Sequence, residues 1–261
     1  MRIVTFASGS SGNCSLISEG KANILIDAGI SMRRTLAALS ELGLAPQDLC
    51  GVLITHEHSD HISGLSMLLK HYEMSIFAPK SLCEELARLK PETKTSLNAI
   101  PEGEKFDLGG IEVSCFRTMH DAVYSVGYRF EGEQTAAFAT DVGCINDTLI
   151  GGLEGADLAL IEANHDLAML RNGRYPYFLK QRILAPTGHL SNDDSGKLAL
   201  HLAKSGTSNI ILGHLSRDNN TPELALSTVR AAVSGENTEI SVASPNNLLA
   251  VEAHERLKCL V

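Results

Sequence analysis

The sequence predicts an α/β protein in which two mixed β-sheets pack face to face and helices cover their outer faces. Two observations support this fold class: three closely spaced strand-like segments open the chain, and strands then alternate with helices. That order is typical of layered α/β architectures. With 261 residues, 44% of them hydrophobic, the chain can bury a large core. Because no repeat, low-complexity tract or proline-rich linker interrupts the sequence, we expect a single domain over residues 1–261.

Short runs of β-branched and apolar residues between turn-forming residues mark the expected strands. The first three runs are separated by SGSSGN and EGK. The segment SGSSGN lacks the Gly-Lys-Ser/Thr ending of a phosphate-binding loop, so we interpret it as a hairpin turn. The expected strands cover residues 2–7, 14–18, 23–27, 51–55, 75–78, 97–100, 111–117, 124–130, 135–139, 157–162, 208–213, 238–243 and 248–252.

Helical spacing of apolar residues marks the expected helices between these strands. The first of them has Met32, Leu36, Leu39 and Leu42 along one face. The expected helices cover residues 32–42, 61–72, 80–89, 191–204 and 222–233.

The overall composition narrows the classes of function. A formal net charge of −9 argues against a broad basic surface for non-specific nucleic-acid binding, although bound divalent cations would still create a local anion site. The opening MRIVTF lacks the features of a signal peptide, and no stretch approaches the roughly 18 apolar residues that span a bilayer. We therefore expect a soluble, cytoplasmic protein. The scattered cysteines are expected to be reduced and mostly buried: Cys14, Cys50, Cys83, Cys115, Cys144 and Cys259.

A cluster of potential metal ligands follows the apolar strand at 51–55. His56 and His58 lie two residues apart, so extended backbone directs both imidazoles to one side, and Asp60 and His61 begin the next helix. Four such groups within six positions are costly to bury without a cation. Imidazoles combined with carboxylates suit zinc or manganese better than magnesium or calcium. The alternative is a polar surface turn with chance histidines.

This cluster resembles the HxHxDH signature of the metallo-β-lactamase superfamily. The resemblance implies an αββα four-layer sandwich and further ligands at the ends of later strands. Candidates in the order that the family requires are His120 after strand 111–117, Asp141 after strand 135–139 and His214 after strand 208–213.

By analogy with the superfamily, two divalent ions occupy such a site. Asp27 in ILIDAG matches a family position that supports the metal-bearing loop through hydrogen bonds. Two adjacent cations lower the pKa of a shared water and stabilise developing charge, so the implied reaction is hydrolysis. The implied ligands are His56, His58 and His120 for one ion, Asp60, His61 and His214 for the other, and Asp141 as the bridge.

A histidine and a glutamate further along the chain are candidates for proton transfer. His189 in PTGHLSNDD resembles the GHST-type element of tRNA-processing phosphodiesterases in the superfamily, whose histidine protonates or stabilises the leaving oxygen. Glu162 occupies the place of its partner glutamate, although Ile161 replaces the neighbouring histidine of the HEAT-type pattern. The alternative for His189 is a polar residue at a helix start. His165 either faces the cleft or ends the strand.

Residues 167–192 contain no acidic side chain and carry aromatic residues between the basic ones. Cations contact phosphates and aromatic faces stack on exposed bases, so this segment is a candidate nucleic-acid track beside His189. An amphipathic helix with a solvated face explains the pattern equally well. The candidate substrate-binding residues are Arg171, Arg174, Lys180 and Arg217.

The order of motifs over about residues 3–230 resembles the YycJ (WalJ) family of bacterial metallo-β-lactamase-fold proteins. The motifs are GSSGNC, LITHEHSDH, TMHDA, TDVG, EANHD, GHLSND and GHLSRDNN. The resemblance implies a 5′→3′ exonuclease on double-stranded DNA, related to the RNA-processing branch. No spacing in the sequence distinguishes DNA from RNA. The chain is too short for the inserted clamping domain of larger nucleases, so local loops would have to hold the substrate.

The preferred hypothesis is a phosphodiester hydrolase, with DNA as the favoured substrate. Metal-bound hydroxide attacks phosphorus, Asp60 and Asp141 position it, and His189, oriented by Glu162, assists departure of the leaving oxygen. The second hypothesis is a hydrolase of a small thioester, lactone or cyclic phosphodiester, which the acidic charge would suit. The third is a metal-stabilised nucleic-acid-binding module without catalysis. None of the three involves a membrane.

Overall fold

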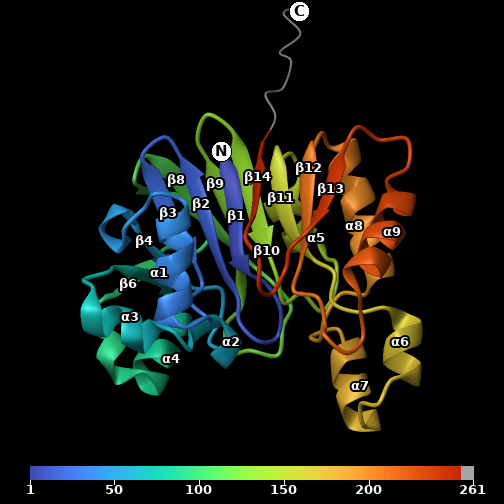
Figure 1. The fold of residues 1–261 in the computed structure, drawn as a ribbon, viewed down its shortest axis with the longest axis horizontal. Helices are drawn as coiled ribbons and strands as arrows, with labels where there is room; N and C mark the ends of the chain where they lie inside the picture. Colours follow the sequence, from blue (N-terminus) through green and yellow to red (C-terminus); the bar gives the residue numbers. More distant parts are fainter. Residues whose placement is uncertain (254–261) are drawn as a thin grey trace, which may run out of the picture.

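The computed structural model describes residues 1–253 and contains two seven-stranded β-sheets packed face to face (Figure 1). Helices lie outside both sheets, so the predicted four-layer architecture is confirmed. In strand order, the first sheet contains β14 (Leu249–Glu252), β1 (Arg2–Ala7), β2 (Cys14–Glu19), β3 (Ala22–Ile26), β4 (Gly51–Leu53), β5 (Ile76–Pro79) and β6 (Leu97–Ile100). The second contains β13 (Glu239–Val242), β12 (Asn209–Gly213), β11 (Leu158–Glu162), β10 (Thr135–Ala139), β9 (Val126–Glu131), β8 (Ile111–Arg117) and β7 (Phe106–Leu108).

The helices form the two outer layers, and further short helices lie along the lower edge of Figure 1. The first sheet is covered by α1 (Met32–Glu41), α3 (Leu65–His71) and α4 (Lys80–Leu89). The second is covered by α5 (Asp147–Leu153), α8 (Asn192–Lys204) and α9 (Pro222–Ala232). At the lower edge lie α2 (Ser59–Ile62), α6 (Leu167–Asn172) and α7 (Tyr177–Leu184), and short 3-10 turns occupy Pro46–Asp48 and Pro91–Thr93.

Buried side chains form one core between the sheets and one beneath each helical layer. The alternation of a strand explains how one segment serves two of them. In β3, Ile24 and Ile26 face the core between the sheets, whereas Leu25 faces the helices of the first outer layer. Strands buried on both faces are almost continuously apolar, which is the pattern that made them recognisable in the sequence.

Parallel pairing brings several strand ends to one edge of the molecule. β3 to β6 are parallel in the first sheet, and β10 to β13 are parallel in the second. β8 runs in the same direction as β10, because each of them pairs antiparallel with β9. In α/β proteins, ligands bind beyond the carboxyl ends of such strands, so this edge is where a functional site is expected.

The main difference from the predicted elements is the helix expected over 61–72. It is two helices, α2 and α3, which are interrupted at Ser63 and Gly64. The Gly64 backbone N–H donates to the Ala28 carbonyl oxygen, and a Cβ at this position would lie only 2.1 Å from the Ile30 carbonyl oxygen. The prediction also lacked β7, α5, α6 and α7. In α5 the helical pattern is weakened by Gly151 and Gly152.

The five cysteines within the described residues are free thiols, in agreement with the prediction. Three are buried and two are partly exposed, and Cys259 lies outside the described residues. None of the helices within residues 1–253 combines the length and the apolar character needed to cross a bilayer.

Candidate metal centre

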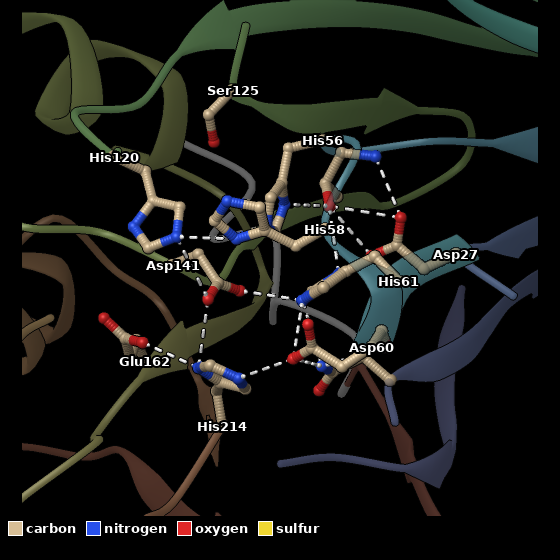
Figure 2. A network of polar contacts seen from close by, with 12 residues as sticks. Asp27, His56, His58, Asp60, His61, His120, Ser125, Asp141, Glu162 and His214 are labelled. Carbon is tan, nitrogen blue, oxygen red and sulfur yellow. Dashed lines mark hydrogen bonds and ion pairs between the residues drawn. The ribbon is translucent and has the colours of Figure 1, made fainter. Parts of the chain in front are cut away.

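Imidazole and carboxylate side chains from distant segments converge at the edge where the parallel strands end (Figure 2). The HEHSDH segment lies between β4 and α2, and the other side chains follow or end strands of both sheets. The predicted residues brought together are Asp27, His56, His58, Asp60, His61, His120, Asp141, Glu162 and His214, and His189 joins them through Glu162.

Three of these residues adopt a left-handed backbone conformation. The φ angles are 58° for Asp27 and 56° for both Asp141 and His214, and no other non-glycine residue in the range 1–253 has a positive φ. Each of the three lies within two residues of the end of a parallel strand. Such conformations cost on the order of 1–3 kcal/mol each and are typical of functional sites. Here the turn redirects a side chain from the strand into the site.

His56, His58 and His120 form the first potential ligand group, with one ring nitrogen from each within 4.8 Å of the others. His120 Nδ1 lies 3.1 Å from the Gly188 carbonyl oxygen, to which it donates, so Nε2 is the free nitrogen; it lies 3.4 Å from His58 Nδ1. His56 Nε2 is buried and has no hydrogen-bond partner among residues 1–253. Burial lowers the pKa of His56 and of His120, which favours the neutral imidazoles that bind metal.

Asp60, His61 and His214 form the second potential ligand group. His61 Nδ1 donates to Asp27 Oδ2 at 2.7 Å, and His214 Nδ1 lies 2.9 Å from Glu162 Oε1. The two Nε2 atoms lie 3.5 and 3.6 Å from Asp60 Oδ2, and His214 Nε2 has no hydrogen-bond partner in the described part of the chain. A carboxylate that holds one ring nitrogen leaves the other for a cation, as is common in protein metal sites.

Asp141 lies between the two groups. Its Oδ2 is 3.2 Å from His61 Nε2, and its Oδ1 is 3.3 Å from His214 Nδ1 and 3.7 Å from His120 Nε2. The carboxylate therefore reaches imidazoles of both groups at once. This is the position that the sequence resemblance implied for a bridging ligand.

The carboxylates and imidazoles of the second group and Asp141 shift one another's pKa values. Burial alone would raise the pKa of Asp60 and Asp141, but the neighbouring imidazoles His61 and His214 hold both well below the usual carboxyl range. Burial would also lower the pKa of the His61 and His214 imidazoles. The neighbouring carboxylates outweigh this effect: they raise the pKa of His61, and they raise the pKa of His214 to about 10. The surroundings of His61 and His214 therefore favour positive charge. Together with the unpartnered buried nitrogens, this makes the clusters able to bind metal.

Glu162 and His189 form a pair beside the second group. His189 Nδ1 donates to Glu162 Oε1 at 2.8 Å, and Glu162 Oε2 accepts the backbone N–H groups of Val142 and Leu190 at 3.0 and 2.9 Å. Burial opposes the charged form of both residues. Even so, the positive charge of His189 lowers the pKa of Glu162 to about 2, and the negative charge of Glu162 raises the pKa of His189. The predicted pairing of these residues is thus present in the geometry.

The structure adds two polar residues that sequence reasoning missed. Asn13 Nδ2 lies 3.0 Å from His61 Nε2, and the Thr55 hydroxyl and backbone N–H each donate to Asp27 at 2.9 Å. Asn13 belongs to SGSSGN, which is not just a hairpin turn: its backbone N–H donates to the Asp60 carbonyl oxygen at 2.7 Å. Gly29 completes this contact, because a Cβ there would lie 1.6 Å from the same oxygen. Both residues belong to motifs of the resembled family, GSSGNC and LITHEHSDH, but nothing in the local sequence indicates the contacts that they make.

A cavity of about 290 Å³ opens over the metal centre. Its lining includes the candidate ligands other than His56 and His61, which are fully buried. His189, Tyr175 and Arg182 also line it, and the Arg182 guanidinium forms an ion pair with Asp121. His165, whose role was left open, is buried and its backbone bridges to Ser191. It is not part of this cavity lining.

The predicted basic segment forms α6, a connecting turn and α7. Lys180 Nζ donates to the carbonyl oxygens of Arg171 and Gly173, both at 2.7 Å, and thereby closes the turn between the two helices. The Arg171 side chain is exposed. Arg174 and Arg217 line a second cavity next to the metal centre.

Comparisons with known proteins show the family and the fold of this chain. A family model described as the Beta-lactamase superfamily domain matches residues 22–214. The exodeoxyribonuclease WalJ of Streptococcus pneumoniae serotype 2, strain D39, is 40% identical over 227 residues, 85% of this chain and 84% of WalJ. The exodeoxyribonuclease YycJ of Bacillus anthracis is 37% identical over 225 residues, 85% of each chain. The crystal structure of Zn²⁺-bound PqqB from Methylobacterium extorquens shares the fold, with a TM-score of 0.75, 17% identity and coverage of 95% of this chain and 99% of PqqB.

Proposed function

Because this chain belongs to the metallo-β-lactamase superfamily and, within it, to the WalJ/YycJ family, we propose that it is a metal-dependent exonuclease that hydrolyses DNA in the 5′→3′ direction. The observation that carries the proposal is the pair of ligand groups joined by Asp141, next to the Glu162–His189 pair and beside a cavity that His189 lines. In this proposal residues 1–261 act as one catalytic domain, and a cytoplasmic location fits a DNA substrate.

The proposed cofactor is a pair of divalent ions, zinc or manganese. The donor chemistry supports this choice, because both groups combine imidazole nitrogens with carboxylate oxygens. When bound, two such ions supply a water molecule of lowered pKa and stabilise charge that develops at phosphorus. The proposed ligands are His56, His58 and His120 for the first ion, Asp60, His61 and His214 for the second, and Asp141 for both.

The protein's own residues orient the reacting groups. Asp60 and Asp141 face the cavity and accept hydrogen bonds from the attacking water, which directs its lone pair toward phosphorus. His189 also lines the cavity, and because its Nδ1 is bonded to Glu162, Nε2 is the nitrogen that delivers a proton to the leaving oxygen. Glu162 is fixed by two backbone N–H groups, so it holds the imidazole in one orientation.

The test combines metal analysis with three substrates in parallel. Purified protein is depleted of metal, reconstituted with zinc or manganese, and assayed on bis(p-nitrophenyl) phosphate, on a simple thioester and on a 5′-phosphorylated DNA duplex labelled at either end. We expect about two ions per chain, hydrolysis of both phosphodiesters and release of mononucleotides from the 5′ end. Strong thioester hydrolysis without nuclease activity would favour the small-molecule hydrolase instead.

A second test distinguishes an enzyme from a binding module. Asp60→Ala and His189→Ala variants distinguish catalysis from binding, because a binding module that uses metal only for folding retains its biological activity in both. We expect both variants to lose nuclease activity. Retained activity in both variants would overturn the proposed function.

A further inference from the structure

A second cavity, of about 580 Å³, adjoins the cavity over the metal centre, and Tyr175 lines both. We name it the lateral groove: it lies between residues 172–175, in the turn from α6 to α7, and Arg217 and Asp218, in the loop after β12. That loop begins at the proposed metal ligand His214. A molecule bound at the metal centre and extending past Tyr175 therefore enters the lateral groove.

The lateral groove is basic in an acidic protein. Arg174 lines it from the turn between α6 and α7 and Arg217 from the loop after β12, and both are exposed. Within residues 1–253 neither guanidinium forms an ion pair, whereas Arg182 in the neighbouring cavity forms one with Asp121. The carboxylate that lines the groove, Asp218, accepts the Tyr175 hydroxyl at 2.9 Å. The lateral groove thus contains two guanidinium groups without an ion pair among residues 1–253 and one carboxylate that is already hydrogen-bonded.

The walls of the lateral groove are held in place by close packing. The Asp166 backbone N–H donates to the Asn219 carbonyl oxygen at 2.9 Å, which ties the start of α6 to the loop after β12. A Cβ at Gly173 would lie 2.6 Å from the Met169 carbonyl oxygen and 2.7 Å from Asn219 Oδ1. The two arginines therefore project from a fixed frame, which reduces the ordering cost of binding.

Exposed aromatic side chains follow shortly after Tyr175 in the chain. Tyr177 and Phe178, at the start of α7, are 77% and 73% exposed, which is unusual for rings of this size. Guanidinium groups that contact phosphates, next to aromatic faces on which bases stack, are the two components of sites that bind single strands without sequence preference.

We propose that the lateral groove binds the sugar-phosphate backbone of the nucleic-acid strand adjacent to the bond cleaved at the metal centre. Arg174 and Arg217 contact its phosphates, and Tyr175 separates the reacting nucleotide from the part of the strand in the groove. The inference rests on the proposed nuclease function and adds where the substrate strand runs.

The test measures strand binding separately from hydrolysis. A fluorescent single-stranded phosphorothioate oligonucleotide, which resists cleavage, is titrated with the metal-loaded protein and followed by anisotropy at several salt concentrations. The variant Arg174→Gln/Arg217→Gln removes the two charges of the lateral groove. The matched control, Lys21→Gln/Lys204→Gln, removes two exposed charges elsewhere. Lys21 lies in the turn between β2 and β3, and Lys204 ends α8, about 18 Å along the helix from its first residue, Asn192.

We expect the groove variant to bind the oligonucleotide at least tenfold more weakly and the control to bind within twofold of the unaltered protein. Because each phosphate contact on a single strand contributes about 0.7 to the dependence of log K on log salt, the slope should fall by about 1.4. The single variant Arg217→Gln should show about half of that change and repeats the test if the double variant fails to fold. Thermal midpoints of all variants verify folding.

The outcomes separate the lateral groove from the proposed function. Unchanged binding by the groove variant, or an equal loss in the control, overturns the inference, and hydrolysis of bis(p-nitrophenyl) phosphate by the unaltered protein still supports a phosphodiesterase. A loss confined to the groove variant supports the lateral groove. If the unaltered protein then hydrolyses no phosphodiester, the proposed function fails while the groove remains a strand-binding site.

Discussion

The replacement Asp27→Asn tests how the second ligand group is oriented. Asp27 is fully buried, and its Oδ2 accepts a hydrogen bond from His61 Nδ1 at 2.7 Å. Asparagine keeps the size of the side chain and tolerates the φ of 58°, so the backbone should not change. The amide oxygen can still accept the Thr55 backbone N–H in place of Oδ1, which leaves the amide NH₂ facing His61 Nδ1.

Two donors cannot pair, so His61 changes tautomer and carries its proton on Nε2. That nitrogen faces Asp60 and Asp141 and is the proposed metal ligand. Loss of such an orienting partner typically lowers metal affinity 10- to 100-fold, about 1.4–2.8 kcal/mol. Independently of metal binding, loss of the hydrogen bond between His61 and the charged carboxylate should lower the free energy of unfolding by about 1–3 kcal/mol.

The measurement is a zinc titration against a competing chelator, with metal-free protein as the starting state. We expect one of the two ions to bind 10- to 100-fold more weakly in Asp27→Asn, with nuclease activity restored in part by excess metal. The control is Asp157→Asn. Asp157 precedes β11, at the end of this strand far from Glu162, and accepts the Thr135 backbone N–H at 2.8 Å, which an amide oxygen can do as well. Unchanged affinity for both ions in Asp27→Asn would refute the reasoning.

Three further predictions concern proton transfer, packing and thiol reactivity. His189→Ala should lower kcat on DNA by about 10²–10⁴ but by less than tenfold on bis(p-nitrophenyl) phosphate, whose leaving group departs without a proton; equal losses would argue against a general acid. Gly29→Ala places a Cβ 1.6 Å from the Asp60 carbonyl oxygen and should lower the thermal midpoint by at least about 6 °C. Gly151→Ala fills open space in α5 and should stabilise the protein by about 0.5–1 kcal/mol. Calorimetry that ranks the two variants the other way would contradict this packing. Burial raises the pKa of Cys83 and of Cys115 to about 11, so at pH 8 only about one thiol in 10³ is ionised. Labelling of these thiols by Ellman's reagent should therefore be slow at pH 8 and accelerate toward pH 11. Rapid labelling of either residue at pH 8 would be inconsistent with that environment.

Most strands and long helices could be predicted because their signals are local. β1, β6, β8, β10 and α4 have the predicted bounds, since apolar runs and helical spacing are independent of distant residues. The break between α2 and α3 could not be predicted in this way. It arises where Gly64 meets the carbonyl oxygens of Ala28 and Ile30, which belong to a segment more than 30 positions away.

The HEHSDH segment was identified from sequence because its ligands lie on one short stretch of chain, so their spacing alone indicates a shared metal. His120, Asp141 and His214 followed from the order of motifs in the family that the chain resembles. Their convergence is now explained physically: parallel pairing brings the ends of β10 and β12 to the edge that also holds the end of β4, and β8 ends there as well.

Residue type and local spacing in the sequence determined the fold class and the ligand chemistry of the HEHSDH segment. The resemblance to known families added the later candidate ligands and the candidate proton donor His189. Tertiary structure decided which nitrogen each imidazole keeps free, that Asp141 reaches both ligand groups, and that Lys180 closes a turn while Arg174 and Arg217 line a groove. Those properties depend on left-handed turns at strand ends and on contacts between segments far apart in the chain. Such contacts arise only when both sheets pack together.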